Sequence, residues 1–256
     1  MTHSEAGQPL KPQPFSLARL PGIQSVAVWP PSLPLTTQLQ TLFAGPVRVY
    51  VLILPEDPAP WIRMLEPFAS GARRERAARF HFPADALRCL AAEALLGHAL
   101  HEAHGLDIGT LACRAGGNGK PRFQNLPAVH FNLTHSGRWV MCALHNRPIG
   151  IDVEEEKTGA ALPAENIMCH EEYRYFQSLA LPAAREFFYR LWTLKESFVK
   201  ALGTGLRLDP RELRIHFEDP IITAGIGSRR LPRWPLRELA MPAGAKASLC
   251  CRSVNR

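Results

Sequence analysis

Two segments in the second half of the chain have hydrophobic patterns that predict a strand and a helix, both carrying acidic residues. From Pro148 to Glu154, apolar residues alternate with other residues, as side chains on a strand alternate between its two faces. One face of the predicted strand is therefore apolar and consists of Ile149, Ile151 and Val153. Asp152 and Glu154 fall together on the opposite face.

The second segment, from Glu186 to Leu202, has the period of a helix. Its apolar residues predict a buried stripe formed by Phe187, Leu191, Leu194, Phe198 and Leu202. The opposite face carries Tyr189, Thr193, Glu196 and Lys200. An acid and a cation one turn apart are by themselves typical of a solvated helix surface. The long apolar stripe and the neighbouring Trp192 favour instead a helix whose polar face lines a cleft.

The acidic residues of the two segments suggest a common site. Two neighbouring carboxylates on one strand face repel each other unless a cation lies between them, and oxygen ligands of this kind suit a divalent metal. Taken alone, Asp152 and Glu154 could equally be the exposed end of a strand. With Glu196 and Lys200 as partners, we expect a site for a metal ion and a phosphate group.

The remaining periodicities predict a mixed chain of helices and strands. Helices are expected at 66–79, 84–104, 164–178 and 183–202, and strands at 47–54, 129–134, 139–144, 149–154, 212–218 and 247–252. The glycine-rich stretch 115–121 is expected to be a loop. Seven prolines within residues 1–34 predict an irregular extension over residues 1–40. Two mixed halves are expected after it, at 41–146 and 147–256.

Composition and charge restrict the class of protein. Hydrophobic residues make up 46% of the chain, and no apolar run approaches the roughly 20 residues of a membrane-spanning helix. The net charge of +7 would suit nucleic acid, an anionic membrane, a polyphosphate ligand or an acidic protein, and the lack of a nucleic-acid-binding motif argues against the first. We expect neither a nucleic-acid nor a membrane partner. The N-terminus has no secretory pattern and the six cysteines have no zinc spacing. We therefore expect reduced cysteines and a cytoplasmic location.

Five motifs resemble, in the same order along the chain, those of the 4′-phosphopantetheinyl transferases. Gly-Ile-Asp-Val-Glu at 150–154, followed by Trp-Thr-Leu-Lys-Glu-Ser-Phe-Val-Lys at 192–200, is similar to the paired signature of that family. Three further blocks match at 73–96 (Arg-x-x-Arg-x-x-Arg-Phe-x-Phe-x-x-Asp-Ala-x-Arg), at 119–121 (Gly-Lys-Pro) and at 131–136 (Phe-Asn-Leu-Thr-His-Ser). In the last block, Thr134 replaces the usual serine. The resemblance is closer to the large, monomeric Sfp-type branch.

This resemblance implies a fold, a reaction and its partners. The fold would be α+β, with two similar α/β halves packed about a pseudo-twofold axis. The reaction would transfer the 4′-phosphopantetheine group of coenzyme A to a serine of an apo carrier protein, giving the holo carrier protein and 3′,5′-ADP. The acceptors would be acidic acyl, peptidyl or aryl carrier proteins of fatty-acid, polyketide, siderophore or nonribosomal-peptide synthesis. The cofactor would be Mg²⁺, with Mn²⁺ as the alternative, and the enzyme would be a monomer.

The resemblance also assigns roles to individual residues. Asp152, Glu154 and Glu196 match the metal-binding carboxylates, and Glu196 is the expected general base, because a serine hydroxyl needs its proton removed in the transition state. Lys200 and His135 complete the expected catalytic set, with Lys200 on a phosphate oxygen and His135 on the pyrophosphate. The residues expected to contact coenzyme A are Arg73, Arg76, Arg88, Gly119, Lys120, Pro121, Asn132, Thr134, His135 and Lys200. Among them, Lys120 is expected to bind the 3′-phosphate of the nucleotide.

Two other functions remain compatible with the same residues. A magnesium-dependent phosphodiester hydrolase would use the three acids with water as the acceptor. A non-catalytic module would bind coenzyme A or a carrier protein, and it would not need a general base. The chain has no Walker-type loop and no Gly-x-Gly-x-x-Gly, which argues against a nucleoside triphosphatase or a dinucleotide enzyme. For a carrier protein, we expect contacts with apolar residues around 167–176 and 203–206.

Overall fold

The computed structural model of the protein describes residues 27–29, 47–117, 119–218 and 221–253. The proline-rich extension expected over residues 1–40 lies outside the described residues, apart from the short strand β1 (Ala27–Trp29). None of the described helices has the length and apolar composition needed to cross a membrane. All six cysteines are described and free, and only Cys113 is exposed.

The first half of the chain forms a four-stranded antiparallel sheet covered by helices. The strand order is β1-β2-β6-β5, with β2 at Arg48–Ile53, β5 at His130–Ser136 and β6 at Trp139–His145. The helices are α2 (Ala59–Leu65), α3 (Gly71–Ala77) and α4 (Pro83–His104), with 3-10 turns η2 (Glu66–Phe68) and η3 (Ile108–Thr110). A small hairpin joins β3 (Cys113–Ala115) to β4 (Pro121–Phe123). The core of this half lies between α4 and its sheet.

The second half forms a five-stranded antiparallel sheet in the order β7-β11-β10-β9-β8. Its strands are β7 (Ile149–Glu155), β8 (Leu213–Glu218), β9 (Ile221–Ile226), β10 (Arg229–Leu239) and β11 (Ala245–Cys251). The helices are α5 (His170–Ser178) and α6 (Leu181–Leu202), with 3-10 turns η4 (Ala164–Asn166), η5 (Gly205–Arg207) and η6 (Pro210–Glu212). The long helix α6 packs on β7 and β11.

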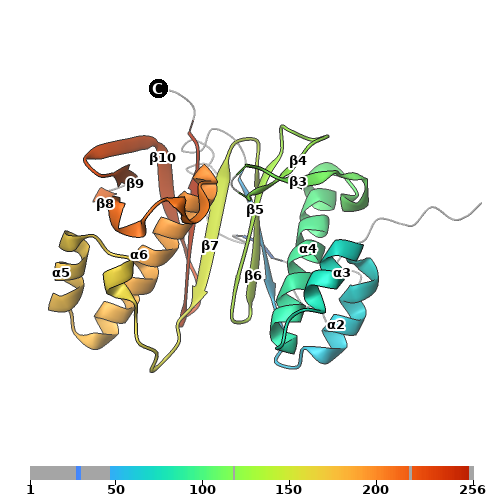
Figure 1. The fold of residues 1–256 in the computed structure, drawn as a ribbon, viewed down its shortest axis with the longest axis horizontal. Helices are drawn as coiled ribbons and strands as arrows, with labels where there is room; N and C mark the ends of the chain where they lie inside the picture. The colour runs from blue at the N-terminus through green and yellow to red at the C-terminus, as the bar shows by residue number, and fades with distance from the viewer. Residues whose placement is uncertain (1–26, 30–46, 118, 219–220, 254–256) are drawn as a thin grey trace, which may run out of the picture.

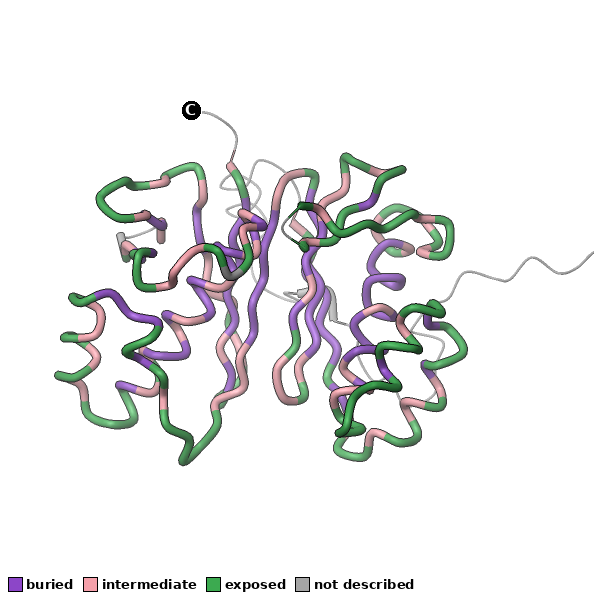
Figure 2. Tube along the Cα trace, viewed as in Figure 1, coloured by how far each residue is buried: buried purple, intermediate pink, exposed green. Residues whose placement is uncertain are grey.

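The two halves meet at their sheets. Figure 1 shows β5, β6 and β7 side by side in the centre, with α2, α3 and α4 on one side and α5 and α6 on the other. Apolar residues of β2 and β6 pack there against Ile149, Ile151 and Val153 of β7, all fully buried. Figure 2 shows buried positions along these central strands and exposed positions in the outer loops. The predicted apolar face of the strand at 149–154 is confirmed, and its neighbour is the other half of the molecule.

Several sequence-based expectations differ from the structure. The single helix expected at 66–79 is wrong, because Ala69 and Ser70 are extended and separate η2 from α3. Ser70 caps α3 by accepting a hydrogen bond from the backbone N–H of Arg73. The strands β9 and β10 were not predicted. Pro232 and Pro235 interrupt the sequence pattern of β10, and the register with β9 shifts between Leu231 and Pro235.

Gly150 allows α6 to lie directly against β7. A Cβ atom at this position would lie 2.1 Å from the carbonyl oxygen of Ser197 and 2.3 Å from the backbone nitrogen of Ala201. No side chain tolerates contacts that short, so the close approach of helix and strand requires glycine. This approach brings the polar face of α6 to the acidic residues of β7.

We expect Gly150→Ala to lower the free energy of unfolding by roughly 2–3 kcal/mol, because the added methyl group forces α6 away from β7. Urea denaturation of the full chain measures the effect. Gly71→Ala is the matched control, because a Cβ there meets no atom within 4 Å. The steric argument is wrong if the two variants are equally stable.

Candidate active site

Polar side chains of β5 bond to the edge of β7 that no strand of the described residues covers. Asn132, Thr134 and Ser136 lie on one face of β5, as the strand period requires. Their side-chain oxygens accept hydrogen bonds from three alternate backbone N–H groups of β7, at 2.8, 3.3 and 3.1 Å (Ile151, Val153 and Glu155, respectively). These side chains take the place of a neighbouring strand. The carboxylates of β7 are thereby held at the junction of the halves.

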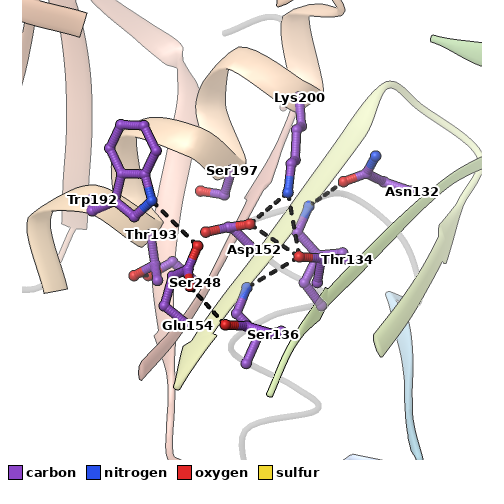
Figure 3. A network of polar contacts seen from close by, with 12 residues as sticks. Asn132, Thr134, Ser136, Asp152, Glu154, Trp192, Thr193, Ser197, Lys200 and Ser248 are labelled. Carbon is purple, nitrogen blue, oxygen red and sulfur yellow. Dashed lines mark hydrogen bonds and ion pairs between the residues drawn. The ribbon is translucent and has the colours of Figure 1, made fainter. Parts of the chain in front are cut away.

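Asp152 is buried at this junction, with 3% of its surface exposed. Its Oδ1 atom accepts hydrogen bonds from Thr134 Oγ1 at 3.0 Å and from Lys200 Nζ at 2.5 Å, contacts that Figure 3 marks with dashed lines. Its Oδ2 atom is also buried and has no hydrogen-bond partner among the described residues. Burial raises the pKa of Asp152 to about 6, and the ammonium of Lys200 opposes this rise. A buried carboxylate oxygen without a partner indicates room for a further cation or donor.

Glu154 is held by two donors from different elements. Ser136 Oγ donates to its Oε2 atom at 2.7 Å, and Trp192 Nε1 donates to its Oε1 atom at 3.3 Å (Figure 3). Ser136 belongs to β5 and Trp192 to α6. The orientation of this carboxylate therefore depends on both halves of the molecule.

The polar face of α6 supplies Glu196 and Lys200 to the same place. Burial raises the pKa of Glu196, Lys200 acts in the opposite direction, and the charge of Glu154 raises it further. Lys200 Nζ also donates to Thr134 Oγ1 at 3.3 Å. A half-buried carboxylate with a raised pKa is a better proton acceptor than a free one.

Two pockets open on either side of these residues. A pocket of about 210 Å³ is lined by Leu133, Thr134, His135, Asp152, Glu154, Trp192, Glu196 and Lys200. A pocket of about 300 Å³ shares Trp192, Glu196 and Lys200 with it and continues to Val199, Leu208 and Pro210. The first is lined mainly by charged and polar side chains, whereas the second has an apolar wall. A substrate with a charged part and an apolar part could occupy both.

The three predicted metal ligands line one pocket, but they do not surround a cation position. Within the described ranges, no three His, Cys, Asp or Glu side chains are close enough together to hold a metal ion. The ammonium of Lys200 instead contacts Asp152. A metal-binding role for the three acids stays a prediction.

The residues expected at coenzyme A do not all line one pocket. Thr134, His135 and Lys200 line the smaller one, and Lys120, Pro121, Asn132 and Lys200 line the larger one. His135 is exposed, while Arg88 donates to the carbonyl oxygen of Gly137 at 2.9 Å and pairs with Asp85. On α3, Arg73 is half-buried and pairs with Glu93 at 3.5 Å, and Arg76 is exposed. Their roles toward a nucleotide stay predictions.

The Gly-Lys-Pro segment borders the larger pocket, and its role toward the nucleotide stays a prediction. Gly119 is exposed with a φ of 83°, and Pro121 lines the larger pocket. The ammonium of Lys120 faces inward and donates to two backbone carbonyl oxygens, of Ile149 and of Lys200. Burial lowers the pKa of Lys120 to about 8.

Lys195 has a structural position beside Glu196. It is almost completely buried, and its ammonium contacts Glu172 at 2.6 Å and the carbonyl oxygens of Ile167 and Pro210 at 2.9 Å each. This contact ties α5 and the segment before β8 to α6. Ile167 itself is buried in the core of the second half, whereas Tyr175 in the same region is exposed. The expected contact of the region 167–176 with a carrier protein stays a prediction.

Two further site residues were not among those expected. Ser136 continues the alternation begun by Asn132 and Thr134, and that period of two could have identified it from the sequence. Trp192 was noted beside the polar stripe, but only the folded chain reveals its contact with Glu154.

Comparison with known proteins finds one family over most of the chain. A family model described as "4'-phosphopantetheinyl transferase, N-terminal" matches residues 58–147, and the "4'-phosphopantetheinyl transferase superfamily" model matches residues 148–243. The 4'-phosphopantetheinyl transferase Sfp of Bacillus subtilis (strain 168) is 32% identical over 72% of this chain and 82% of its own length. The chain belongs to the 4′-phosphopantetheinyl transferase family.

Two further members of the family extend the comparison. The 4'-phosphopantetheinyl transferase ffp of Bacillus subtilis is 33% identical over 73% of this chain and 83% of its own length. The 4'-phosphopantetheinyl transferase psf-1 of Bacillus pumilus is 41% identical, over 57% of this chain and 62% of its own length. These matches confirm the Sfp-type resemblance and the α+β fold that it implied. The two family models meet between residues 147 and 148, next to the change from the first sheet to the second.

Proposed function

We propose that the chain transfers the 4′-phosphopantetheine group of coenzyme A to a serine hydroxyl of an apo carrier protein. The observation that carries this proposal is the meeting of Glu196 and Lys200 of α6 with Asp152 and Glu154 of β7 at one pocket. Phosphoryl transfer to an alcohol needs a proton acceptor and positive charge near the phosphate oxygens, and the two further carboxylates suit a divalent cation. Family membership supports the same reaction.

In this reaction the serine oxygen forms a bond to the phosphorus that carries the pantetheine arm. The bond from that phosphorus to the bridging oxygen of the pyrophosphate breaks, and 3′,5′-ADP leaves with the electron pair. Glu196 takes the serine proton, directly or through a water molecule. Lys200 holds a phosphate oxygen through its charge. His135 and Thr134, which line the pocket, contact the pyrophosphate.

We propose that a divalent cation binds at the acidic residues of the pocket, whose chemistry suits it although their spacing as described does not enclose one. Asp152 has a buried oxygen without a partner, and the charge of Glu154 helps to raise the pKa values of Asp152 and Glu196, a repulsion that a cation would relieve. Carboxylate oxygens are the ligands that Mg²⁺ and Mn²⁺ prefer, so Asp152, Glu154 and Glu196 would hold the ion. Such an ion polarises phosphoryl oxygens and stabilises the charge that develops on the leaving group.

Charge outside the pocket is consistent with the proposed substrates. Arg73, Arg76 and Arg88 lie in the first half, and we assign them to the phosphates of the nucleotide. The net charge of +7 favours the approach of an acidic carrier protein. We propose that the enzyme acts as a monomer in the cytoplasm.

The proposal is tested with the full chain, coenzyme A, Mg²⁺ and several apo carrier proteins. Intact-mass spectrometry should show each true acceptor gaining one phosphopantetheine. A phosphodiester hydrolase would consume coenzyme A and leave the carriers unmodified. A binding module would leave both unchanged.

At Mg²⁺ concentrations well below saturation, where protons and the cation compete for the same carboxylates, we expect kcat/KM for the transfer to fall as the pH is lowered through about 6. Burial raises the pKa of Asp152 to about 6, so below this pH the carboxyl group is protonated and loses its charge toward Lys200 and a cation. Burial also raises the pKa of Glu196, so lowering the pH protonates this carboxylate as well and the enzyme loses its proton acceptor. Because kcat/KM reports groups of the free enzyme, its logarithm should fall with a slope of about one or more below this pH. A profile that stays flat down to pH of about 5 would contradict the expectation.

A further inference from the structure

Lys120 connects three segments that are distant in the sequence. It lies at the end of the loop before β4, in the first half, and its side chain is half-buried. Its Nζ atom donates to the carbonyl oxygen of Ile149 and to that of Lys200, both at 2.6 Å. The first carbonyl belongs to the start of β7 and the second to the last turn of α6.

The carbonyl of Lys200 is one that the helix itself leaves unbonded. The last four carbonyl groups of a helix have no partner within it, and a cation near them also interacts favourably with the helix dipole. The turn that ends α6 is closed by Gly203, whose N–H donates to Val199 O and whose φ is 72°. A Cβ on Gly203 would lie 3.3 Å from Lys120 Cδ, so the stem of the lysine packs against this turn. Lys120, which lies outside the helix, therefore supplies a hydrogen-bond donor to a carbonyl group in the last turn of α6.

The carbonyl of Ile149 lies on the uncovered edge of β7. Residues two apart on a strand point their backbone groups to the same edge, so Ile149 shares this edge with Ile151 and Val153. The N–H groups of those two residues bond to side chains of β5. Lys120 adds a further contact at the start of the same row. In this way the first half of the chain covers the edge of β7 with side chains alone.

We propose that Lys120 is a positioning residue, which fixes the end of α6 to the start of β7 and so sets Glu196 and Lys200 against Asp152. The resemblance described above implies a different role, as a ligand of the 3′-phosphate of the nucleotide. The two roles need the same ammonium, which the fold itself supplies with two carbonyl partners, Ile149 O and Lys200 O. Burial lowers the pKa of Lys120 to about 8, and nearby Arg122 adds to this effect, consistent with an ammonium withdrawn from solvent.

The two roles predict different results for coenzyme A and 3′-dephospho-coenzyme A. A ligand of the 3′-phosphate contributes only when that phosphate is present, so its loss reduces the preference between the two donors. A positioning residue affects the reacting groups equally with either donor. The kinetic part of this test rests on the proposed function, whereas the hydrogen exchange of the ligand-free chain does not.

The test compares Lys120→Met with the wild type and with Arg122→Met, in the full chain. Methionine keeps the length of the stem and removes the ammonium. Arg122 is an exposed cation two residues away, so its variant controls for the loss of charge. Transfer kinetics with both donors and hydrogen exchange at residues 200–203 without ligand are measured for each protein.

For Lys120→Met we expect kcat/KM to fall about tenfold or more with both donors, because hydrogen bonds from a charged group are lost. The ratio of the two values should stay within about twofold of the wild-type ratio. Hydrogen exchange at residues 200–203 should accelerate about tenfold or more, since the last turn of α6 loses its partner. Arg122→Met should leave both measurements near those of the wild type.

Two results would overturn the proposal: unchanged exchange at the end of α6, or a loss confined to the donor with the 3′-phosphate. A Lys120→Met chain that fails to fold, beside an Arg122→Met chain that folds, would support it. If the wild type uses both donors equally, the 3′-phosphate makes no functional contact and the alternative role of Lys120 is excluded. Hydrogen exchange at residues 200–203 then tests the positioning role by itself. A wild type that transfers from neither donor refutes the proposed function, and the exchange measurement still tests Lys120.

Discussion

Glu196→Gln is expected to lower kcat for phosphopantetheine transfer by at least about a hundredfold, because the amide cannot take the proton of the acceptor serine. The substitution keeps the size of the side chain, so the pocket and the packing of α6 should be preserved. Coenzyme A should bind with nearly unchanged affinity, since its phosphates are assigned to other residues. Transfer is followed by the mass of the carrier protein, and binding by isothermal titration calorimetry.

This substitution also changes a proposed metal ligand, so the measurement must separate the two roles. Repeating the assay over a range of Mg²⁺ concentrations does so. Raising the Mg²⁺ concentration cannot restore activity that was lost with the general base. If the substitution only weakens metal binding, a higher Mg²⁺ concentration fills the site by mass action and partly restores activity. Recovery of most activity at high Mg²⁺ would assign Glu196 to metal binding alone. If Glu196→Gln turns over near the wild-type rate at the Mg²⁺ concentration of the standard assay, Glu196 is neither the general base nor a metal ligand.

Asp152→Asn is expected to lower kcat/KM by about a hundredfold or more. It removes the negative charge that would hold the cation and that pairs with Lys200, and these two positive groups stabilise the charge on the phosphate oxygens. Asparagine has nearly the same shape, so its effect is not one of packing. The Lys200 ammonium, which pairs with Asp152 at 2.5 Å, loses its charged partner at the same time. Binding of Mn²⁺, measured by electron paramagnetic resonance in the presence of coenzyme A, should weaken in parallel.

Glu156→Gln is the matched control for this second experiment. Glu156 belongs to the same run of acids, but it follows the end of β7 and does not line the pocket of Asp152. Its variant should keep both transfer and Mn²⁺ binding. If Asp152→Asn retains full activity without added metal, the proposed cation site does not exist. If both variants lose Mn²⁺ equally, binding depends on the total acidity of the segment and not on Asp152.

Local patterns predicted the elements that carry the site and missed others of equal length. The strand at 149–154 and the helix at 183–202 were recognisable because each carries its apolar residues along one face, which leaves a clear period in the sequence. The 11-residue strand β10 was missed because Pro232 and Pro235 are typical of breaks in a strand, and its irregular register with β9 accommodates them. The helix expected at 66–79 was interrupted by Ser70, which begins a new helix as its N-cap.

By itself, the sequence determined which residues share a face of an element and which family the chain resembles. Asp152 with Glu154, and Glu196 with Lys200, follow directly from the periods of strand and helix. Only the tertiary structure decided which faces meet. It placed Asp152 in the interior, joined Ser136 and Trp192 to Glu154, and turned Lys120 inward to two carbonyl groups. These contacts join segments up to 80 residues apart, and they depend on how closely α6 approaches β7 at Gly150, a distance that no local periodicity encodes.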